Sequence, residues 1–303
     1  MDMFFVETVI SGLMAGVMYS LVAIGFVLIF KASGVFNYAQ GVLALFAALT
    51  LHGVMDKFGI PAWAAIPITM AAMIAVAYLV DYFILRHLVN EPPIILFMAT
   101  IGLAYILEGA GDIIWGSDVK VLDVGLPQGA SDYLLDNFNL YIEKLEIVAA
   151  VVAAILVVVL AIFFQKTRIG RALRAVADDH QAALSIGISL RAIWRIVWSV
   201  SGFVALVAGI MWGSKSGVQF SLSLIALKAL PVLILGGFTS IPGAIVGGLI
   251  IGVGEKLAEI YAGELLGIAG LNAIENWFAY MLALVFLLFR PQGLFGEKII
   301  ERV

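Results

Sequence analysis

Long apolar runs, separated by short polar or glycine-containing stretches, recur along the whole chain. The charge-free runs 8–30, 61–80, 147–164 and 196–214 each come close to or exceed the roughly 20 residues that an α-helix needs to cross a bilayer. Open strand edges cannot lie in lipid, because the bilayer core offers the backbone no hydrogen-bond partners. We therefore interpret these runs as transmembrane helices.

Three further runs, at 37–55, 94–107 and 276–289, are shorter or more polar, and each fits a span with some tilt. The stretch 229–254 is free of charge but broken in the middle, which predicts a turn between two helices. The residues that break it are Gly236, Gly237, Ser240, Pro242 and Gly243. The pattern thus predicts an all-α, polytopic membrane helix bundle of about eight or nine transmembrane helices, with broken or re-entrant segments.

Composition agrees with this interpretation. The 303 residues are 63% hydrophobic and 13% charged, whereas a soluble domain is about half apolar and about a quarter charged. The net charge of −4 is too weak and too scattered for nucleic-acid binding. The sequence has no cysteine, which excludes disulfides, thiolate nucleophiles and iron–sulfur clusters, and its 3 histidines are too far apart to suggest a metal site.

Catalytic patterns are missing from the sequence. It contains no HExxH zinc motif, no GxSxG nucleophile elbow and no paired aspartates inside an apolar run. The dipeptide Gly-Lys never occurs, so there is no P-loop, and any ATP that drives the protein must bind another chain. We therefore expect a chain that is not an enzyme and holds no cofactor.

Basic and acidic residues are divided unevenly between the predicted loops. The loop 166–195 is the richest in lysine and arginine, and such loops stay in the cytoplasm. The loops 115–144 and 255–275 are acidic, so we place them outside. With Arg290 and the basic residues that follow it, this distribution predicts an N-terminus outside and a C-terminus inside.

A few charges lie within or at the ends of the predicted spans. Lys228 is well inside an apolar segment, where a charge costs about 3 kcal/mol on insertion scales. It either faces a cavity or partner, or lies near the outer interface and extends to water. Glu108 and Asp112 end one span and Asp81 ends another; we interpret them as solvated at the interface, with a proton relay as the alternative.

Polar residues interrupt the chain between the first two spans, in the sequence Gly34-Val-Phe-Asn-Tyr-Ala-Gln-Gly41. Two glycines bracket Asn37, Tyr38 and Gln40, an arrangement suited to a helix break whose polar side chains and unwound backbone face a cavity. An ordinary cytoplasmic loop is the alternative interpretation.

Glycines spaced by four residues recur in the apolar runs. They are Gly12 and Gly16, Gly243 and Gly247, and Gly248 and Gly252. Small residues at this spacing allow two helices to approach closely. They predict internal helix packing, with a subunit interface as the alternative.

The basic loop contains an alanine-rich segment between Gly170 and Gly187 that is predicted to be one amphipathic helix, with Gly187 as its C-terminal stop. Its apolar face comprises Leu173, Val176, His180, Ala183 and Leu184. This face is mostly small, and no Phe or Trp occurs before Trp194, so insertion into lipid would be weak. We expect the helix to dock on a protein partner.

Four segments carry motifs in a fixed order. They are Gly34 to Gly41, the run Asp178-Asp179, Ala182, Ala183 and Gly187-Ile188, the glycine-rich stretch Leu235 to Leu249, and Arg290 to Gly296. Together they resemble the GxxNFAxG motif, the coupling loop, the GSIPG turn and the C-terminal PxG signature of the branched-chain amino acid (LivH-like) branch of the ABC importer permeases. The resemblance covers residues 11–296.

This resemblance implies a single permease domain over residues 1–303, in a bacterial cytoplasmic (inner) membrane, that imports branched-chain amino acids or related small solutes. Its partners would be a second permease, either a paralogue or another copy, two ATPase subunits that bind ATP and Mg²⁺, and an extracytoplasmic solute-binding protein. The residues implied in ATPase coupling, within loop 166–195, are Arg171, Arg174, Ala175, Asp178, Asp179, Ala182, Ala183, Gly187 and Ile188. Those implied along the translocation pathway are Asn37, Tyr38, Gln40, Gly41, Lys228, Gly236, Gly237, Ser240 and Pro242.

The chain departs from the family pattern at two places. Many members have His-Gly-Glu where this chain has Gln40-Gly41-Val42, which removes a titratable pair and leaves the solute open. Asp178 replaces the usual glutamate and keeps its charge.

A secondary carrier or a passive facilitator for small polar solutes is the alternative function, and it predicts transport by the chain alone.

Overall fold

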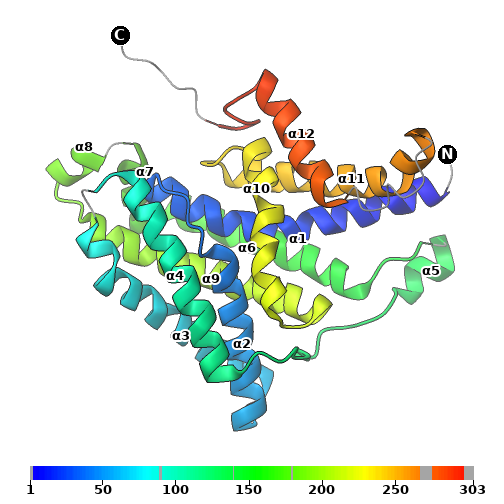
Figure 1. The fold of residues 1–303 in the computed structure, drawn as a ribbon, viewed down its shortest axis with the longest axis horizontal. Helices are drawn as coiled ribbons and strands as arrows, with labels where there is room; N and C mark the ends of the chain where they lie inside the picture. Colours follow the sequence, from blue (N-terminus) through cyan, green and yellow to red (C-terminus); the bar gives the residue numbers. More distant parts are fainter. Residues whose placement is uncertain (1–2, 89–90, 139, 179, 267–274, 297–303) are drawn as a thin grey trace. The chain divides into compact units, whose positions relative to one another are not determined.

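The computed structural model describes residues 3–88, 91–138, 140–178, 180–266 and 275–296 (Figure 1). Within these residues the regular structure is helical, apart from two isolated β-bridges. The helices are α1 (Met3–Ser33), α2 (Gln40–Phe58), α3 (Ala62–Phe83), η1 (Leu85–His87), α4 (Pro93–Trp115), α5 (Asp132–Phe138), α6 (Lys144–Lys166), α7 (Arg168–Asp178), α8 (His180–Ser185), α9 (Leu190–Ser216), η2 (Phe220–Leu224), α10 (Ile225–Gly236), α11 (Ile241–Leu266) and α12 (Glu275–Phe289).

The predicted all-α membrane bundle is confirmed. In the described part of the chain 7 helices are long and apolar enough to cross a membrane, and two shorter apolar helices cover Phe220–Gly236 and Trp277–Phe289. The first of these two shorter helices ends at Gly236, in the glycine-rich break, as its sequence pattern predicts. Together these helices fit the predicted range of about eight or nine.

Two features differ from the sequence expectation. The loop 115–144 contains the short helix α5, which carries no apolar run long enough to reveal it. Helix α11 continues to Leu266, so residues 255–266 are helical although their acidic character suggested an outer loop. An amphipathic helix end tolerates charges when they are paired, which the sequence pattern alone does not reveal.

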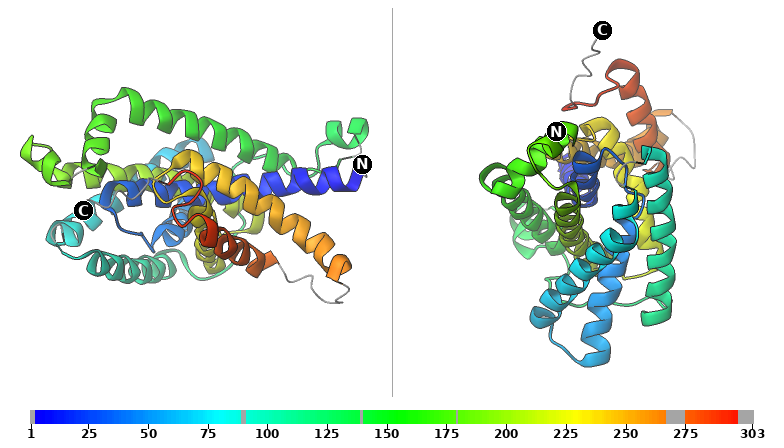
Figure 2. Two further views of the ribbon diagram at one scale, coloured as in Figure 1. Left: turned by 90° about the horizontal axis from the view of Figure 1, so that it is seen from above. Right: turned by 90° about the vertical axis from the view of Figure 1, so that its left-hand side faces the viewer.

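The chain divides into two compact units. Unit 1 comprises Met1–Val27, Leu126–Ala153 and Leu227–Val303, and unit 2 comprises Leu28–Gly125 and Ala154–Ala226. Figures 1 and 2 show the path of the chain through both. Each unit is described by itself below.

The centre of unit 2 is α2, which packs against α3, α4 and α9. Most of its residues are buried, from Gln40 to Val54. Helices α2 and α9 approach each other closely at Gly209 of α9. A Cβ atom at Gly209 would collide with the carbonyl oxygen of Ala44 on α2. Small residues on both helices therefore let the two backbones pack directly.

In unit 1 the glycines spaced by four residues join α1 to α11. A Cβ atom at Gly12 would lie 2.7 Å from the Cα atom of Val253, and one at Gly16 would collide with the carbonyl oxygen of Gly248. The hydroxyl of Ser20 adds a bond to the carbonyl of Ala244 at 3.2 Å. These contacts confirm internal helix packing as the role of these glycines.

Candidate functional site

The residues between α1 and α2, 34–39 of unit 2, form with the first two residues of α2 the polar break 34–41, which side chains from neighbouring helices stabilise. The Trp194 indole of α9 donates to the carbonyl of Ala32 at 3.2 Å. The Tyr38 amide donates to the Thr100 hydroxyl of α4 at 3.0 Å. Backbone groups that a continuous helix would pair internally are thus satisfied from the side.

Two amides of this break are buried. Asn37 is 0% exposed and Gln40 is 1% exposed. The Ser201 hydroxyl, also buried, donates to Gln40 Oε1 at 2.8 Å. Asn37 Oδ1 accepts from the Ala39 amide at 3.1 Å, whereas Asn37 Nδ2 has no hydrogen-bond partner among the described residues. A buried donor left unpaired is costly, so this amide is the group at the break best suited to a further polar partner.

The other two predicted residues of the break have different surroundings. Gly41 is buried, and a Cβ atom there would collide with the Ser223 carbonyl and the Ala226 side chain. Tyr38 is exposed, and its ring meets Phe97 edge to face at a centroid distance of 6.5 Å. The structure therefore brings Asn37, Gln40 and Gly41 to the interior of unit 2 and leaves Tyr38 on its surface.

Lys228 lies in unit 1, on α10, and its partners belong to the same unit. Its Nζ atom donates to the Tyr19 hydroxyl at 3.3 Å and lies 4.0 Å from Oε2 of Glu255. The Lys228 side chain is 25% exposed and the Glu255 side chain is 2% exposed. The sequence left two interpretations of Lys228, a charge that faces a cavity or partner and a charge that extends to water. The structure supports the first. Glu255 was missed, because the sequence placed it in a loop.

The turn of α10 that carries Lys228 is loosened by a proline. Pro231 has no N–H group, so it cannot donate to the carbonyl of Leu227, its partner in a regular helix. The Tyr280 hydroxyl of α12 donates to that carbonyl instead, at 2.6 Å. Lys228 thus follows a residue whose backbone is bonded to another helix.

The glycine-rich break between α10 and α11 is a tight backbone joint. Cβ atoms at Gly236 and Gly243 would each collide with the backbone of the other glycine, and Gly237 has a φ of +102°, which favours glycine. The Ser240 hydroxyl accepts from the Gly243 amide at 3.1 Å and caps α11. Pro242 is at the second position of that helix, where its missing N–H costs little.

The C-terminal segment binds this joint directly. The Leu294 amide donates to the Leu235 carbonyl at 2.8 Å, and the Phe295 amide donates to the Gly236 carbonyl at 3.1 Å. A Cβ atom at Gly293 would lie 2.7 Å from the amide nitrogen of Gly237. The segment thus satisfies carbonyls that the end of α10 leaves unpaired. Two motifs far apart in sequence therefore form one structure.

The segment predicted to couple to an ATPase is helical in both parts that the structure describes on either side of residue 179, which are α7 and α8. Leu173, Val176 and Ala183 are buried within unit 2. Leu184 is 50% exposed although the periodicity placed it on the buried face, and Ile186 is 73% exposed. The basic residues Arg171 and Arg174 are exposed and Ala175 is half-buried. Asp179 and the side chains of Asp178 and Ala182 lie outside the described residues.

Gly187 ends α8 as predicted. Its φ is +84°, its amide bonds to the Leu184 carbonyl at 3.0 Å, and the Ile188 amide bonds to the Ala183 carbonyl at 3.0 Å. This pair of bonds defines a Schellman motif, in which a left-handed glycine closes the helix. Gly170 has a separate steric role, since a Cβ atom there would collide with the carbonyl oxygens of Phe163 and Phe164.

The prediction that Asp81 is solvated at the membrane interface is wrong. It is 4% exposed, and its Oδ2 accepts from Nε and Nη2 of Arg195 at 2.9 Å and 2.6 Å. The Arg195 guanidinium also lies 4.7 Å from the centre of the Tyr78 ring. The two charges are 114 residues apart in sequence. Periodicity in one segment gives no signal for such a pair.

Acidic and histidine side chains do not assemble as metal ligands within the described residues. The polar chemistry of the described chain is instead concentrated in the amides at the break 34–41, the Lys228–Glu255 pair and the Asp81–Arg195 pair. Hydroxyls, amides and paired charges can bind and orient a polar solute.

Comparison with protein families identifies one that matches most of the chain. Residues 8–290 match the family described as the permease component of branched-chain amino acid transport systems. The chain is also 28% identical to the high-affinity branched-chain amino acid permease protein BraD of Pseudomonas aeruginosa, over 99% of this chain and 98% of that protein. It is 28% identical to the corresponding protein LivH of Salmonella typhimurium over the same shares of the two chains.

More distant matches extend the comparison. The chain is 24% identical to the fructose import permease protein FruF of Bifidobacterium longum, over 78% of this chain and 66% of that protein. Among solved structures, PsaBC from Streptococcus pneumoniae in complex with Fab has a TM-score of 0.50 and 12% sequence identity, over 94% of this chain and 92% of that chain. At this identity the structural match bears on the fold alone.

Proposed function

The chain belongs to the family of permease components of branched-chain amino acid transport systems, and from this premise we propose that it forms the membrane pathway of an ATP-driven importer. The observation that carries the proposal is the family match over residues 8–290, which covers all or most of each apolar helix described above. We further propose that both compact units act together as one permease domain.

The solute we propose is a branched-chain amino acid or a related small molecule. The relatives BraD and LivH are named as branched-chain amino acid permeases, which supports an amino acid as the solute. The relative FruF is named as a fructose import permease, so similar chains are named for other solutes as well. The buried groups at the break 34–41 are neutral amides, which suits a solute with hydrogen-bonding groups and no strong net charge.

We place the pathway at Asn37, Gln40 and Gly41 in unit 2 and at Lys228 in unit 1. The buried, unpaired Asn37 amide supports the first assignment. The Lys228–Glu255 pair supports the second, because paired charges inside a membrane protein commonly mark a solute or ion route. Gly236, Gly237, Ser240 and Pro242 would act indirectly, as the joint that fixes α10 against α11.

ATP hydrolysis would take place on two partner ATPases that bind ATP and Mg²⁺, since the sequence has no P-loop. A second permease and an extracytoplasmic solute-binding protein would complete the assembly. Closure of the ATPases would shift the permease from an outward-open to an inward-open state. The helices α7 and α8 would link the two equilibria.

The exposed end of α8 is the best candidate for the ATPase contact. Leu184 and Ile186 present apolar side chains on the surface, and the Schellman motif at Gly187 holds them in place. Ala183 is 1% exposed, so its substitution would test packing inside unit 2 instead of docking. Exposed apolar groups next to basic residues suit a groove on a protein partner.

Leu184→Glu tests this contact, with Ser185→Glu as the neighbouring control. We expect Leu184→Glu to uncouple solute uptake from ATP hydrolysis at unchanged membrane abundance, whereas Ser185→Glu retains more uptake because it removes no apolar group. Equal uptake by Leu184→Glu and the unmodified chain would contradict the docking assignment. Gly187→Asp should also reduce coupling, since it alters the left-handed helix end.

The proposed orientation has the N-terminus outside and the loop 166–195 and the C-terminus inside. The bonds from Leu294 and Phe295 to the end of α10 support one part of it, because they connect the glycine-rich joint to the segment that follows Arg290. With Arg290 in the cytoplasm, we propose that this joint is a cytoplasmic turn and not a re-entrant tip.

Affinity purification of the tagged chain from its native membrane in mild detergent tests the proposed function. We expect two nucleotide-binding subunits and a second permease to copurify, with ATPase activity. ATP-dependent uptake of radiolabelled leucine by the reconstituted assembly would support the proposed solute. Transport by the lone chain in liposomes without ATP would overturn the importer and support a carrier or facilitator.

A further inference from the structure

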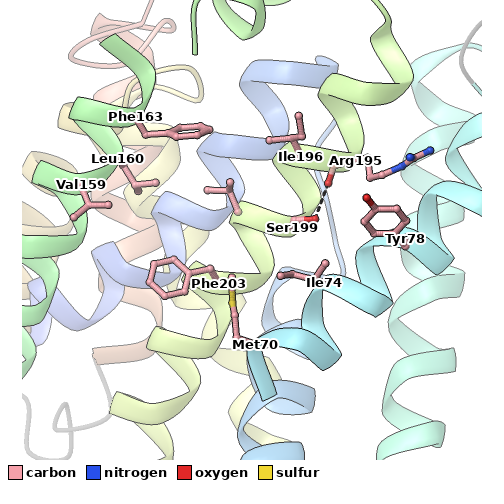
Figure 3. A pocket seen from close by; sticks show the side chains of 11 residues that line it. Met70, Ile74, Tyr78, Val159, Leu160, Phe163, Arg195, Ile196, Ser199 and Phe203 are labelled. Carbon is pink, nitrogen blue, oxygen red and sulfur yellow. Dashed lines mark hydrogen bonds between the residues drawn. The ribbon is translucent and has the colours of Figure 1, made fainter. Parts of the chain in front are cut away.

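An apolar groove of about 370 Å³ lies in unit 2 between α3, α6 and α9 (Figure 3). Its size falls in the range of small-molecule sites, roughly 300–1,000 Å³. Met70 and Ile74 of α3, Val159 of α6 and Phe203 of α9 supply much of its lining. None of the polar groups that we place on the transport pathway lines it.

The dimensions of the groove fit a single hydrocarbon chain. On α9 its lining extends from Arg195 to Phe203, and eight residues of helix rise about 12 Å. One leaflet of the bilayer core is about 15 Å thick, half of roughly 30 Å. The groove therefore covers most of the depth of one leaflet.

One side of the groove is exposed on unit 2. Val159 is 50% exposed and the adjacent Val158 is 56% exposed. In a membrane-spanning helix such a surface meets lipid tails. An apolar groove that opens on this surface is accessible to a tail from the bilayer.

The polar end of the groove carries positive charge. Figure 3 shows Arg195 and Tyr78 at one end, opposite Met70 and Phe203. Arg195 is 38% exposed and uses two of its donors on Asp81, so the others can bind a further acceptor. Arg191, one helical turn before Arg195, and Lys166, one turn beyond Phe163, add two exposed cations near this end. Of these three cations, Arg195 is paired with the carboxylate of Asp81.

We propose that this groove binds the acyl chain of an anionic glycerophospholipid, with the lipid phosphate at Arg195 and in the field of Arg191 and Lys166. The choice of leaflet rests on the proposed function, because it requires the loop 166–195 in the cytoplasm. The cytoplasmic leaflet carries the anionic lipids that basic residues between helices recognise. The lipid would fix α6 against α3 and α9.

Retention of lipid by the full chain, purified with its copurifying subunits, tests this site. The complex is placed in nanodiscs of equal phosphatidylglycerol and phosphatidylcholine, extracted into mild detergent, and the retained lipid is counted by native mass spectrometry. We expect about one phosphatidylglycerol for each chain. Counting retained lipid requires neither ATP nor solute. A negative result for lipid binding is therefore distinct from a failure of the proposed importer function.

Two neighbouring valines provide a matched pair of variants. Val159→Trp fills the groove from α6 and should reduce retained phosphatidylglycerol to background, whereas Val158→Trp adds the same bulk on an exposed position outside the lining and should retain it. Equal retention by the two variants would overturn the site. Loss in both, with folding intact, would assign the lipid to the general α6 surface and also overturn it.

The headgroup contact has its own test. Lys166→Gln with Arg191→Gln should lower the preference for phosphatidylglycerol over phosphatidylcholine by about 25-fold, since each basic residue near an anionic surface is worth about fivefold. An unchanged preference would overturn the charge assignment. Lipid held by the isolated chain but absent from the assembled complex would show that a protein subunit covers the groove, and would overturn the proposal.

Discussion

The backbone groups at the two helix breaks described above find their hydrogen-bond partners in different ways. At the polar break 34–41 of unit 2, side chains of Trp194 and Thr100 satisfy the backbone, and two amides are buried beside it. At the joint 237–240 of unit 1, backbone amides of Leu294 and Phe295 satisfy the carbonyls, and glycines face each other in direct contact.

This difference separates a structural joint from a candidate solute site. Backbone contacts between glycines leave little space, so we propose that the joint holds its helices in place. Side chains can exchange one partner for another at a modest net cost, about 1 kcal/mol for each hydrogen bond. We therefore expect the polar break to respond to a solute and the glycine joint to stay fixed.

The largest effect on stability is expected at the glycine joint. Gly236→Val places a branched side chain against the backbone of Gly243 and should destabilise the protein by about 3 kcal/mol, because neither backbone can move freely. Membrane abundance and the apparent Tm in detergent measure it. Gly102→Val is the control, since a Cβ atom there meets nothing within 4 Å. Equal behaviour of the two variants would refute the joint.

The buried ion pair of unit 1 should have the next largest effect. Glu255→Gln removes the buried carboxylate that lies 4.0 Å from Lys228 Nζ, which we expect to cost about 2 kcal/mol, because the lysine side chain is 25% exposed. Adding Lys228→Met should recover part of the loss. Lys256→Met, from the more exposed Lys256–Glu259 pair, should change the apparent Tm little. A double variant no more stable than Glu255→Gln would argue against the pair.

A smaller effect is expected where side chains support the polar break. Ser201→Ala removes the donor to Gln40 Oε1 and should cost about 1 kcal/mol in the free energy of unfolding. Ser216→Ala, on the same helix but exposed, should leave stability unchanged. A reduction in uptake that exceeds the loss of folded protein would connect this bond to transport, and a purely proportional reduction would not.

The smallest effect on stability is expected at Asn37. Asn37→Ala removes a cap on the Ala39 amide but also removes an unpaired buried donor, so the two contributions offset each other. We nevertheless expect solute uptake by the assembled importer to fall sharply. Normal uptake at normal abundance would show that this amide does not belong to the pathway.

The sequence predicts the helices of this fold well, because each span is a continuous apolar run that lipid requires to be helical. It also predicts the stop at Gly187 and the close packing at Gly12 and Gly16, since glycine has few other reasons to occur there. These features depend on local composition and spacing.

The pairings between distant side chains could not be predicted in this way. Asp81 and Arg195 meet across 114 residues, and Glu255 reaches Lys228 only because α11 extends beyond the apolar run. The contact between the glycine joint and the C-terminal segment likewise depends on how the chain folds back. Charge at the end of a span does not reveal whether it meets water or a partner.

Thiol labelling tests the role of the polar break most directly, because the chain has no cysteine of its own. Ala39→Cys and Leu235→Cys place single thiols at two buried positions, one at each interruption, and leave the Asn37 amide in place. In membranes of the assembled importer, we predict that a membrane-impermeant maleimide labels position 39 during ATP turnover, that solute protects it, and that position 235 stays unlabelled. An inert thiol at position 39 during turnover, or equal labelling at both positions, would contradict the assignment of the break to the pathway.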